Sequence, residues 1–252
     1  MSNLIVVIMA GGLGKRMNSD IPKVLHQIGN KPMLVRVIET SISINPKKIL
    51  IVVGKYKELI KNTISDYVSL DNIEFVDQKN PMGTGHAIQC CIDNLKNFKN
   101  YRVLILSGDV PLVSNETIQN VVKNMDLCKI ITTYIDDPKG LGRIITNNSK
   151  LVKIIEDKDC TDDERKIDLV NTGIYAFKSE MLCKYIPMLN NNNKQNEYYL
   201  TDVIELISVN EHTDIDMYII DKNKQYEIIG VNTKEQLDNL NNIYINFLPS
   251  NL

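Results

Sequence analysis

The segment from Met9 to Lys23 combines three glycines with two basic side chains, Arg16 and Lys23. The glycines are Gly11, Gly12 and Gly14. They let the backbone turn sharply and present bare N–H groups to an anion. Pro22 fixes the backbone beside Lys23. Together these features suit a nucleoside triphosphate, whose charge must be neutralised while bonds change.

Two common phosphate-binding loops do not fit this segment. A Walker A loop requires Gly-x-x-x-x-Gly-Lys-Ser/Thr, but Met9 stands at its first glycine and Arg16 at its hydroxyl residue. A dinucleotide fingerprint requires a small residue at its last position, which Met17 occupies. By themselves, the glycines are equally compatible with a plain turn after a strand.

Two further polar residues have chemistry that a nucleotide site needs. Asp109 follows the apolar run Val103–Leu106, and ligands bind beyond the carboxyl ends of such strands. A carboxylate there suits Mg²⁺, which takes one or two carboxylates together with phosphate oxygens. The amide of Gln78 has both a donor and an acceptor, which a uracil edge requires. An exposed polar side chain is the simpler interpretation of Gln78.

Alternating apolar runs and amphipathic stretches predict the elements that position these residues. The predicted strands are Leu4–Met9, Lys48–Val53, Ile73–Val76, Val103–Leu106, Ile130–Tyr134, Gly142–Ile145, Val152–Ile155, Val170–Phe177 and Ile215–Ile220. The predicted helices are Pro32–Ile44, Lys55–Tyr67, Gly85–Leu95, Asn115–Met125, Glu180–Tyr185, Tyr199–Val209 and Thr233–Phe247. The order favours an α/β doubly wound sheet with helices on both faces. Asn190–Asn196 is predicted to be a solvated loop.

Composition limits the classes of protein that fit. Hydrophobic residues make up 43% of the 252 residues, enough for a sizeable core, and the net charge of -2 argues against a general nucleic-acid surface. The five cysteines show no CxxC spacing, and the three histidines form no zinc motif. The apolar run Leu4–Met9 is too short for a signal peptide or a membrane span. We therefore expect a cytoplasmic protein that binds neither nucleic acid nor membrane.

Several blocks in order resemble those of the nucleotide-sugar pyrophosphorylase family, and most closely the uridyltransferase domain of the bacterial bifunctional N-acetylglucosamine-1-phosphate uridyltransferase. The blocks are Met9-Ala10-Gly11-Gly12-Leu13-Gly14-Lys15-Arg16-Met17 with Pro22-Lys23; Gln78; Gly83-Thr84-Gly85-His86-Ala87; Gly108-Asp109-Val110-Pro111-Leu112; Asp136-Asp137-Pro138 through Gly142-Arg143-Ile144; Ile155-Glu156-Asp157-Lys158-Asp159; Asn171-Thr172-Gly173-Ile174; Asn196-Glu197-Tyr198-Tyr199-Leu200-Thr201-Asp202; and Gly230-Val231-Asn232. The resemblance extends from Leu4 to about Tyr244. An ordered set of blocks is far more specific than any single motif.

The resemblance implies a Rossmann-like mixed sheet and transfer of UMP from UTP to N-acetylglucosamine 1-phosphate, with release of pyrophosphate. It implies one nucleotidyltransferase domain over residues 1–252, with a nucleotide-binding half of about 1–112 and a sugar-binding half of about 113–252. The catalytic residues expected are Arg16, Lys23 and Asp109. The expected substrate-binding residues are Ala10, Gly11, Gly12, Gly14, Gln78, Gly83, Thr84, Gly108, Gly142, Glu156, Asn171 and Asn232.

The resemblance also implies that Asp109 and Asn232 hold Mg²⁺ together. From the sequence alone, Asn232 is equally well placed to be the N-cap of the helix that begins near Thr233. A carboxylate at Glu156 and an amide at Asn171 suit sugar hydroxyls and an acetamido group. For Glu156 a charged turn is the alternative.

Three features depart from the family pattern. Lys15 stands where a small hydroxyl residue is usual, and Ser107 stands where an aromatic residue often precedes Gly-Asp. The chain lacks the β-helix repeats of the acetyltransferase half, so neither acetyl transfer nor the trimer of those repeats is implied. A homo-oligomer of another kind stays open. Two other functions stay open as well: a related transferase using glucose 1-phosphate or dTTP, and a non-catalytic sugar-nucleotide sensor.

Overall fold

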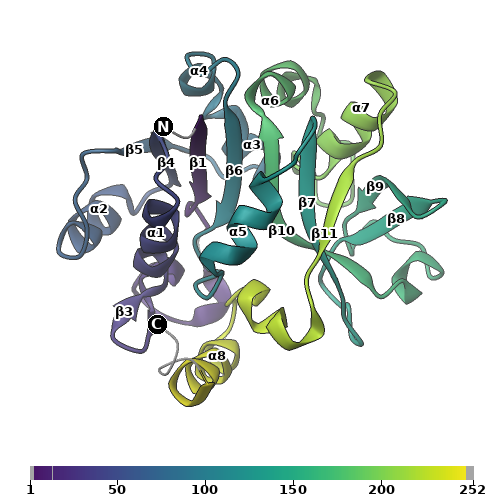
Figure 1. Cartoon of the computed structure of the whole chain (residues 1–252). Helices are drawn as coiled ribbons and strands as arrows, with labels where there is room; N and C mark the ends of the chain where they lie inside the picture. The colour runs from purple at the N-terminus through teal and green to yellow at the C-terminus, as the bar shows by residue number, and fades with distance from the viewer. Residues whose placement is uncertain (1–2, 13, 248–252) are drawn as a thin grey trace.

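The computed structural model describes residues 3–12 and 14–247, apart from the side chains of Lys15 and Phe247. Its main feature is a mixed sheet. The strands of this sheet are β1 (Leu4–Met9), β4 (Lys48–Val53), β5 (Ile73–Asp77), β6 (Arg102–Ser107), β7 (Cys128–Tyr134), β8 (Arg143–Asn147), β9 (Lys150–Ile155), β10 (Leu169–Lys178) and β11 (Asp216–Ile219). The strand order is β11-β7-β10-β6-β1-β4-β5, and the β8–β9 hairpin joins through β10 (Figure 1).

The strands around β1 all run in the same direction. β1 pairs in parallel with β4 and with β6, and β5 continues this arrangement beyond β4. β10 lies antiparallel between β6 and β7, and β11 runs parallel to β7. The carboxyl ends of β1 and β6 therefore meet at one edge, with Met9 beside Ser107. This is the predicted mixed α/β sheet.

Each face of the sheet is covered by helices, which explains why β1 is apolar throughout. Val6 and Ile8 pack with α1 (Met33–Ser43), α2 (Lys57–Ser65) and α5 (Asn115–Val122), while Ile5 and Val7 face the other side. That side is covered by α3 (Thr84–Gln89), α4 (Ile92–Leu95), α6 (Ser179–Tyr185) and α7 (Asp202–Asn210). Figure 1 shows α1 and α5 in front of the strands. A strand buried on both faces has no polar positions to alternate.

A third apolar cluster joins the glycine-rich loop to the end of the chain. Met17, in the short 3-10 helix η1 (Lys15–Met17), packs with Met33, Val231 and Leu240. Leu240 belongs to α8 (Lys234–Phe247), at the bottom of Figure 1. The cluster therefore brings the residues just before α8 beside the loop that follows β1.

Three predicted helices differ from the structure. The stretch Gly85–Leu95 forms α3 and α4, because the Cys91 N–H bonds to the Ile88 carbonyl and tightens the turn. The helix predicted over Asn115–Met125 ends at Val122, since Lys123 is extended and Asn124 has φ 50°. The helix predicted from Tyr199 begins at Asp202. The other predicted helices and strands agree within two residues at either end.

Some elements were not predicted. A two-residue hairpin, β2 (Gln27–Ile28) with β3 (Lys31–Pro32), turns at Gly29. Short 3-10 helices also occur: η2 (Lys23–Leu25), η3 (Glu164–Lys166), η4 (Ile186–Met188) and η5 (Lys222–Ile228). The Asn190–Asn196 tract is free of helix and strand, as predicted. Among the described residues, no helix combines the length and the apolar character needed to cross a membrane.

Candidate active site

A cavity of about 270 Å³ opens at the edge where β1 and β6 end. It is lined by Met9, Ala10, Gly11, Gly12, Lys23, Val24, Gln78, Pro81, Gly83, Thr84, Ala87, Ser107, Asp109 and Glu197. The lining therefore comes from the glycine-rich loop, the segment around Gly83, the end of β6 and the loop before α7. This is the position at which open α/β sheets bind their ligands.

Two glycines of the loop make close contacts. Gly14 has φ 59°, and a Cβ there would lie 2.6 Å from the Cβ of Lys23, so this position requires glycine. A Cβ on Gly11 would lie 2.9 Å from Oε1 of Gln78, and the end of that side chain would have to move. The loop can thus pack against Lys23 on one side and Gln78 on the other.

Lys23 and Asp109 line the cavity, and Lys23 contacts both Asp109 and Asn232. The Lys23 ammonium forms an ion pair with Asp109 Oδ2 and donates a hydrogen bond of 2.9 Å to Asn232 Oδ1. The side chains of Lys23 and Asp109 are each only 13% exposed. Two oxygens from distant parts of the chain therefore already converge on one cation.

Backbone contacts explain how Asn232 reaches Asp109. The N–H of Val231 donates to the carbonyl of Asp109 at 3.0 Å. Thr233, rather than Asn232, caps α8, because the Thr233 hydroxyl accepts from the N–H of Gln236 at 3.2 Å. Gln236 in turn accepts from the N–H groups of Asn232 and Thr233. The N-cap interpretation of Asn232 is wrong, and its side chain is left to face Lys23.

Gln78 is held in one orientation by its neighbours. Its Nε2 donates to the carbonyl of Gly83 at 3.1 Å and lies 3.1 Å from Nδ1 of His86. Because an amide nitrogen can only donate, this contact requires an unprotonated Nδ1 on His86, and burial lowers the pKa of His86, which favours the neutral ring. Both amide hydrogens are then committed. Gln78 can offer the cavity only its Oε1 acceptor.

The segment before α7 closes against the Gly83 turn. The N–H of Gly85 donates to the carbonyl of Tyr198 at 2.7 Å, and the N–H of Leu200 donates to Oγ1 of Thr84 at 3.1 Å. Thr201, one residue further, donates to Oε1 of Glu156 at 3.0 Å. This segment therefore connects the nucleotide-side residues to the residues predicted to read the sugar.

Replacing Gly83 with alanine is expected to destabilise this connection strongly. Gly83 has φ 105°, and an added Cβ would lie 2.5 Å from the Tyr198 carbonyl oxygen. We expect the free energy of unfolding to fall by at least about 2 kcal/mol, because backbone strain and a steric clash add. Thermal or urea unfolding measures the change.

Gly140 provides the matched control for this substitution. Its φ is 82°, but no atom lies within 4 Å of an added Cβ. Gly140→Ala should therefore show the strain alone, roughly 1–2 kcal/mol. Equal losses in the two variants would contradict the clash at Gly83.

The predicted sugar-side residues form a second group beside the cavity. The carbonyl of Gly142 accepts from the N–H of Asn171 at 2.8 Å. Asn171 is buried, and its amide bonds to the Tyr175 hydroxyl at 2.6 Å and to the N–H of Gly173 at 3.1 Å. Burial raises the pKa of Glu156, and nearby carboxylates add to this, although the Thr201 bond opposes it.

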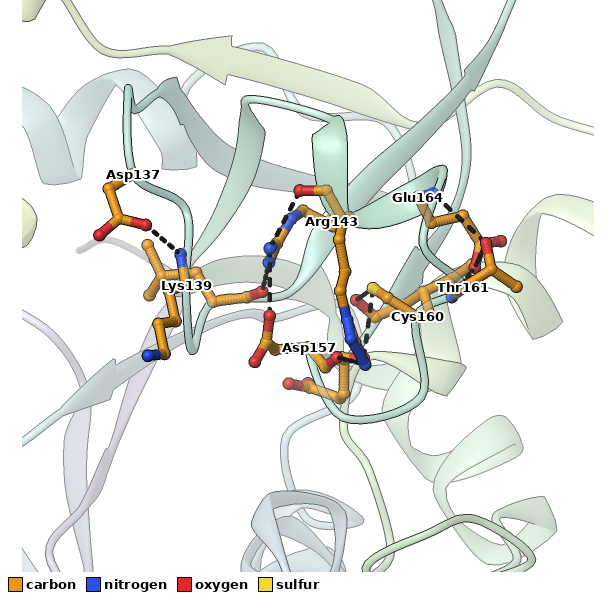
Figure 2. Close-up of polar contacts among 11 residues, drawn as sticks. Asp137, Lys139, Arg143, Asp157, Cys160, Thr161 and Glu164 are labelled. Atoms are coloured by element: carbon orange, nitrogen blue, oxygen red, sulfur yellow. Dashed lines mark hydrogen bonds and ion pairs between the residues drawn. The ribbon is translucent and has the colours of Figure 1, made fainter.

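Arg143 holds the segment that follows β9 and carries Glu156. Its guanidinium is buried, with Nη2 3.0 Å from Asp157 Oδ1 and 3.4 Å from the carbonyl of Arg165. Figure 2 shows Arg143 between its own strand and this segment, with Asp157 and Cys160 nearby. The Cys160 thiol donates to the carbonyl of Glu156 at 3.5 Å. The backbone at Glu156 is thereby fixed from two sides.

Comparison with known proteins shows the family of the chain. Residues 5–225 match the family described as nucleotidyl transferase. The chain belongs to the nucleotidyl transferase family. This nucleotidyl transferase is 42% identical over 245 residues to a protein of Acanthamoeba polyphaga mimivirus named "Probable UDP-N-acetylglucosamine pyrophosphorylase", and the match covers 95% of the chain and 96% of that protein.

A second relative is longer than this nucleotidyl transferase. The "Bifunctional protein GlmU" of Gloeothece citriformis is 40% identical over 237 residues, covering 92% of the chain and 50% of that protein. The chain thus spans half the length of this relative. A crystal structure of UDP-glucose pyrophosphorylase with UDP-glucose matches with a TM-score of 0.75 at 17% identity, covering 97% and 99% of the two chains. At that identity the match shows the fold alone.

Most of the predicted nucleotide-side residues line the cavity, and Asn232 joins them through Lys23. Gly14 and Gly108 lie just outside the lining. A Cβ on Gly108 would lie 3.2–3.3 Å from three neighbouring atoms, so this glycine serves close packing.

Arg16 is exposed on η1 and does not line the cavity, and the side chain of Lys15 lies outside the described part. Gly142, Glu156 and Asn171 form the separate sugar-side group.

Sequence reasoning missed three polar residues of the site. His86 orients Gln78, Glu197 lines the cavity, and Ser107 contacts Asp109. The first two lie in blocks that carry the family resemblance, which was the available signal. Ser107 was noted only as a departure from the pattern. Its contact depends on how the chain turns after β6, which the sequence does not specify.

Proposed function

We propose that the protein is a UDP-N-acetylglucosamine pyrophosphorylase, which transfers UMP from UTP to N-acetylglucosamine 1-phosphate and releases pyrophosphate. The observation that carries the proposal is the convergence of Lys23, Asp109 and Asn232 beside the glycine-rich loop. A lysine, a carboxylate and an amide beside a glycine-rich loop suit phosphate chemistry. The similarity to the mimivirus protein supports this substrate pair.

Asp109 and Asn232 fit a magnesium ion. Both present hard oxygen atoms, and both already face one cation, the Lys23 ammonium. Mg²⁺ is commonly held by one or two protein oxygens, with waters and phosphate oxygens completing its shell. Within the described residues, no cluster of three or more His, Cys, Asp or Glu could hold a metal. When bound, Mg²⁺ would neutralise charge on the reacting phosphates.

The chain's own residues then align two anions rather than abstract a proton. The attacking sugar phosphate is already ionised, so the reaction needs no general base. We assign the N–H groups of Gly11 and Gly12, which line the cavity, to hold the triphosphate, whereas the N–H of Ala10 already donates to the carbonyl of Val52 at 2.8 Å. Lys23 would neutralise the α-phosphate and the charge that develops on the leaving pyrophosphate. We assign Arg16, exposed on η1, to the same leaving pyrophosphate.

The orientation of Gln78 is compatible with UTP as the nucleotide. With Nε2 committed to Gly83 and His86, only Oε1 can meet a base edge, so Gln78 lacks the free donor that the sequence analysis expected for uracil. The N3–H of uracil or thymine can donate to Oε1, but so can the N4 amino group of cytosine. Gln78 therefore accommodates uracil without selecting it, and the assay below distinguishes the nucleotides.

The direct test is a pyrophosphate-release assay over a grid of nucleoside triphosphates and sugar 1-phosphates, with and without Mg²⁺. Release that is fastest with UTP and N-acetylglucosamine 1-phosphate would support the proposal. Faster release with glucose 1-phosphate or dTTP would assign a related transferase instead. Binding of sugar nucleotide with no release for any pair would overturn the proposal and indicate a sensor.

Glu156→Gln is expected to weaken binding of the sugar phosphate alone. The substitution keeps the shape but removes the charge that would accept hydroxyl hydrogens. A hydrogen bond to a charged group contributes about 1.5–3 kcal/mol, so KM for the sugar phosphate should rise about 10- to 100-fold. KM for UTP should stay within about twofold. Steady-state kinetics with each substrate varied in turn measures both constants.

Stability against pH gives a second readout for this variant. The pKa of Glu156 is raised above its ordinary value of 4.5, so the folded state holds the proton more tightly than the unfolded state. The free energy of unfolding should fall as pH rises from 4.5 through the raised pKa, and Glu156→Gln should lack this fall. Glu164→Gln, on the exposed η3, is the control. Equal sugar-phosphate KM values in both variants would remove Glu156 from the site.

A further inference from the structure

Ser107 contacts the carboxylate that the site depends on. It is the last residue of β6 and lines the cavity beside Asp109. Its hydroxyl donates to Asp109 Oδ1 at 2.6 Å, while the other oxygen, Oδ2, meets the Lys23 ammonium. The two carboxylate oxygens therefore have different partners.

The backbone around Asp109 makes this contact specific. The N–H of Val110 donates to the carbonyl of Ser107 at 3.2 Å, which closes a turn over Gly108 and Asp109. The N–H of Gly108 donates to the carbonyl of Met9 at 2.9 Å and ties the turn to β1. A short side chain at the start of this turn can reach the carboxylate two residues later. An aromatic side chain without a hydroxyl could not donate this bond.

We propose that the Ser107 hydroxyl is a positioning group that fixes the rotation of the Asp109 carboxylate and so presents Oδ2 to the metal ion. The proposal rests on the proposed function in one respect, that Asp109 is a magnesium ligand. Ser107 itself does not touch the metal. Groups that hydrogen-bond a metal ligand orient it, and their loss costs about 10- to 100-fold in metal affinity.

The experiment measures metal binding directly, with Mn²⁺ as the probe read by electron paramagnetic resonance, in the presence and absence of UTP. Ser107→Ala should weaken Mn²⁺ binding about 10-fold, at the lower end of that range. Ser107→Thr keeps the hydroxyl and should restore the affinity to within about twofold. Ser107→Cys keeps the shape but has only a weak S–H donor, so its Mn²⁺ affinity should lie between those of Ser107→Ala and Ser107→Thr. Thermal melting establishes that each variant is folded.

Ser179→Ala is the matched control. Ser179 is also a serine with a hydrogen-bonded hydroxyl, which donates to the carbonyl of Phe98 at 2.7 Å. It lies at the opposite edge of the sheet, next to Lys178, which pairs with Arg102 at the start of β6. Losing this hydroxyl should leave Mn²⁺ affinity unchanged.

The catalytic readout separates positioning from general damage. In Ser107→Ala the Mg²⁺ concentration for half-maximal activity should rise about 10-fold, while kcat at saturating Mg²⁺ stays within about threefold. Three results would each overturn the proposal. They are wild-type Mn²⁺ affinity in Ser107→Ala, no recovery of the affinity in Ser107→Thr, and no Mn²⁺ binding to the wild-type protein. If Ser107→Ala weakens Mn²⁺ binding but the wild-type protein releases no pyrophosphate, the positioning role of Ser107 is upheld and the proposed function is rejected.

Discussion

Lys23→Met is expected to lower the rate of pyrophosphate release by about 100- to 1,000-fold while the protein remains folded. Among the side chains that the structure describes, Lys23 is the one cation that lines the cavity, and its ammonium meets both Asp109 and Asn232. Methionine keeps much of the length and the apolar stem but removes the charge. The loss should appear in kcat rather than in KM for UTP, because the charge on the leaving group develops only in the transition state.

The same variant should bind metal more tightly in the absence of nucleotide. The ammonium of Lys23 now occupies the space between Asp109 Oδ2 and Asn232 Oδ1, so an incoming cation must displace it. Without the ammonium, the carboxylate is left uncompensated and attracts Mn²⁺ more strongly. Titration of the nucleotide-free protein measures this change. A catalytic loss accompanied by stronger metal binding would separate the role of Lys23 from that of the metal ligands.

Lys178→Met provides the control for charge loss. Lys178 forms an ion pair of 3.3 Å with Asp126, at the edge of the sheet away from the cavity. This variant should retain both activity and Mn²⁺ affinity. Near-normal turnover of Lys23→Met would contradict the assignment of the cavity as the active site.

The parts of the site that sequence reasoning located are those with local causes. The run Leu4–Met9 must be a buried strand because all its residues are apolar, and the glycines after it must form a turn. Asp109 follows β6, so its place at the carboxyl edge follows from the strand direction. In each case a few neighbouring residues determine the position.

The pairing of Asp109 with Asn232 has no such local cause. It depends on the Val231 N–H bond to the Asp109 carbonyl and on the Met17 cluster, both of which join distant segments. The sequence alone left Asn232 as an N-cap, because the capping residue Thr233 stands directly beside it. Only the family resemblance indicated the pairing. The Gly83 contact with Tyr198 and the Ser107 contact with Asp109 likewise depend on tertiary packing.

Asp109→Asn is expected to reduce the rate of pyrophosphate release by about 100- to 1,000-fold, in common with Lys23→Met, but for a different reason. Asparagine has the same shape, and with its one oxygen facing Lys23 its NH2 group faces the Ser107 hydroxyl, which can accept from it. It lacks the charge that holds a divalent cation. Mn²⁺ affinity should therefore fall in this variant, opposite to its rise in Lys23→Met. Titration of both proteins under the same conditions compares them.

Combining the two substitutions tests whether the residues act as one unit. If Lys23 and Asp109 serve the same transition state, the double variant should be little slower than either single variant, since groups that act together lose their effects together. Losses that multiply would mean that the two residues act independently. Unchanged Mn²⁺ affinity in Asp109→Asn would place the metal elsewhere. In that case the Lys23–Asp109 ion pair would orient the lysine, and Asp109 would act on the phosphates only through Lys23.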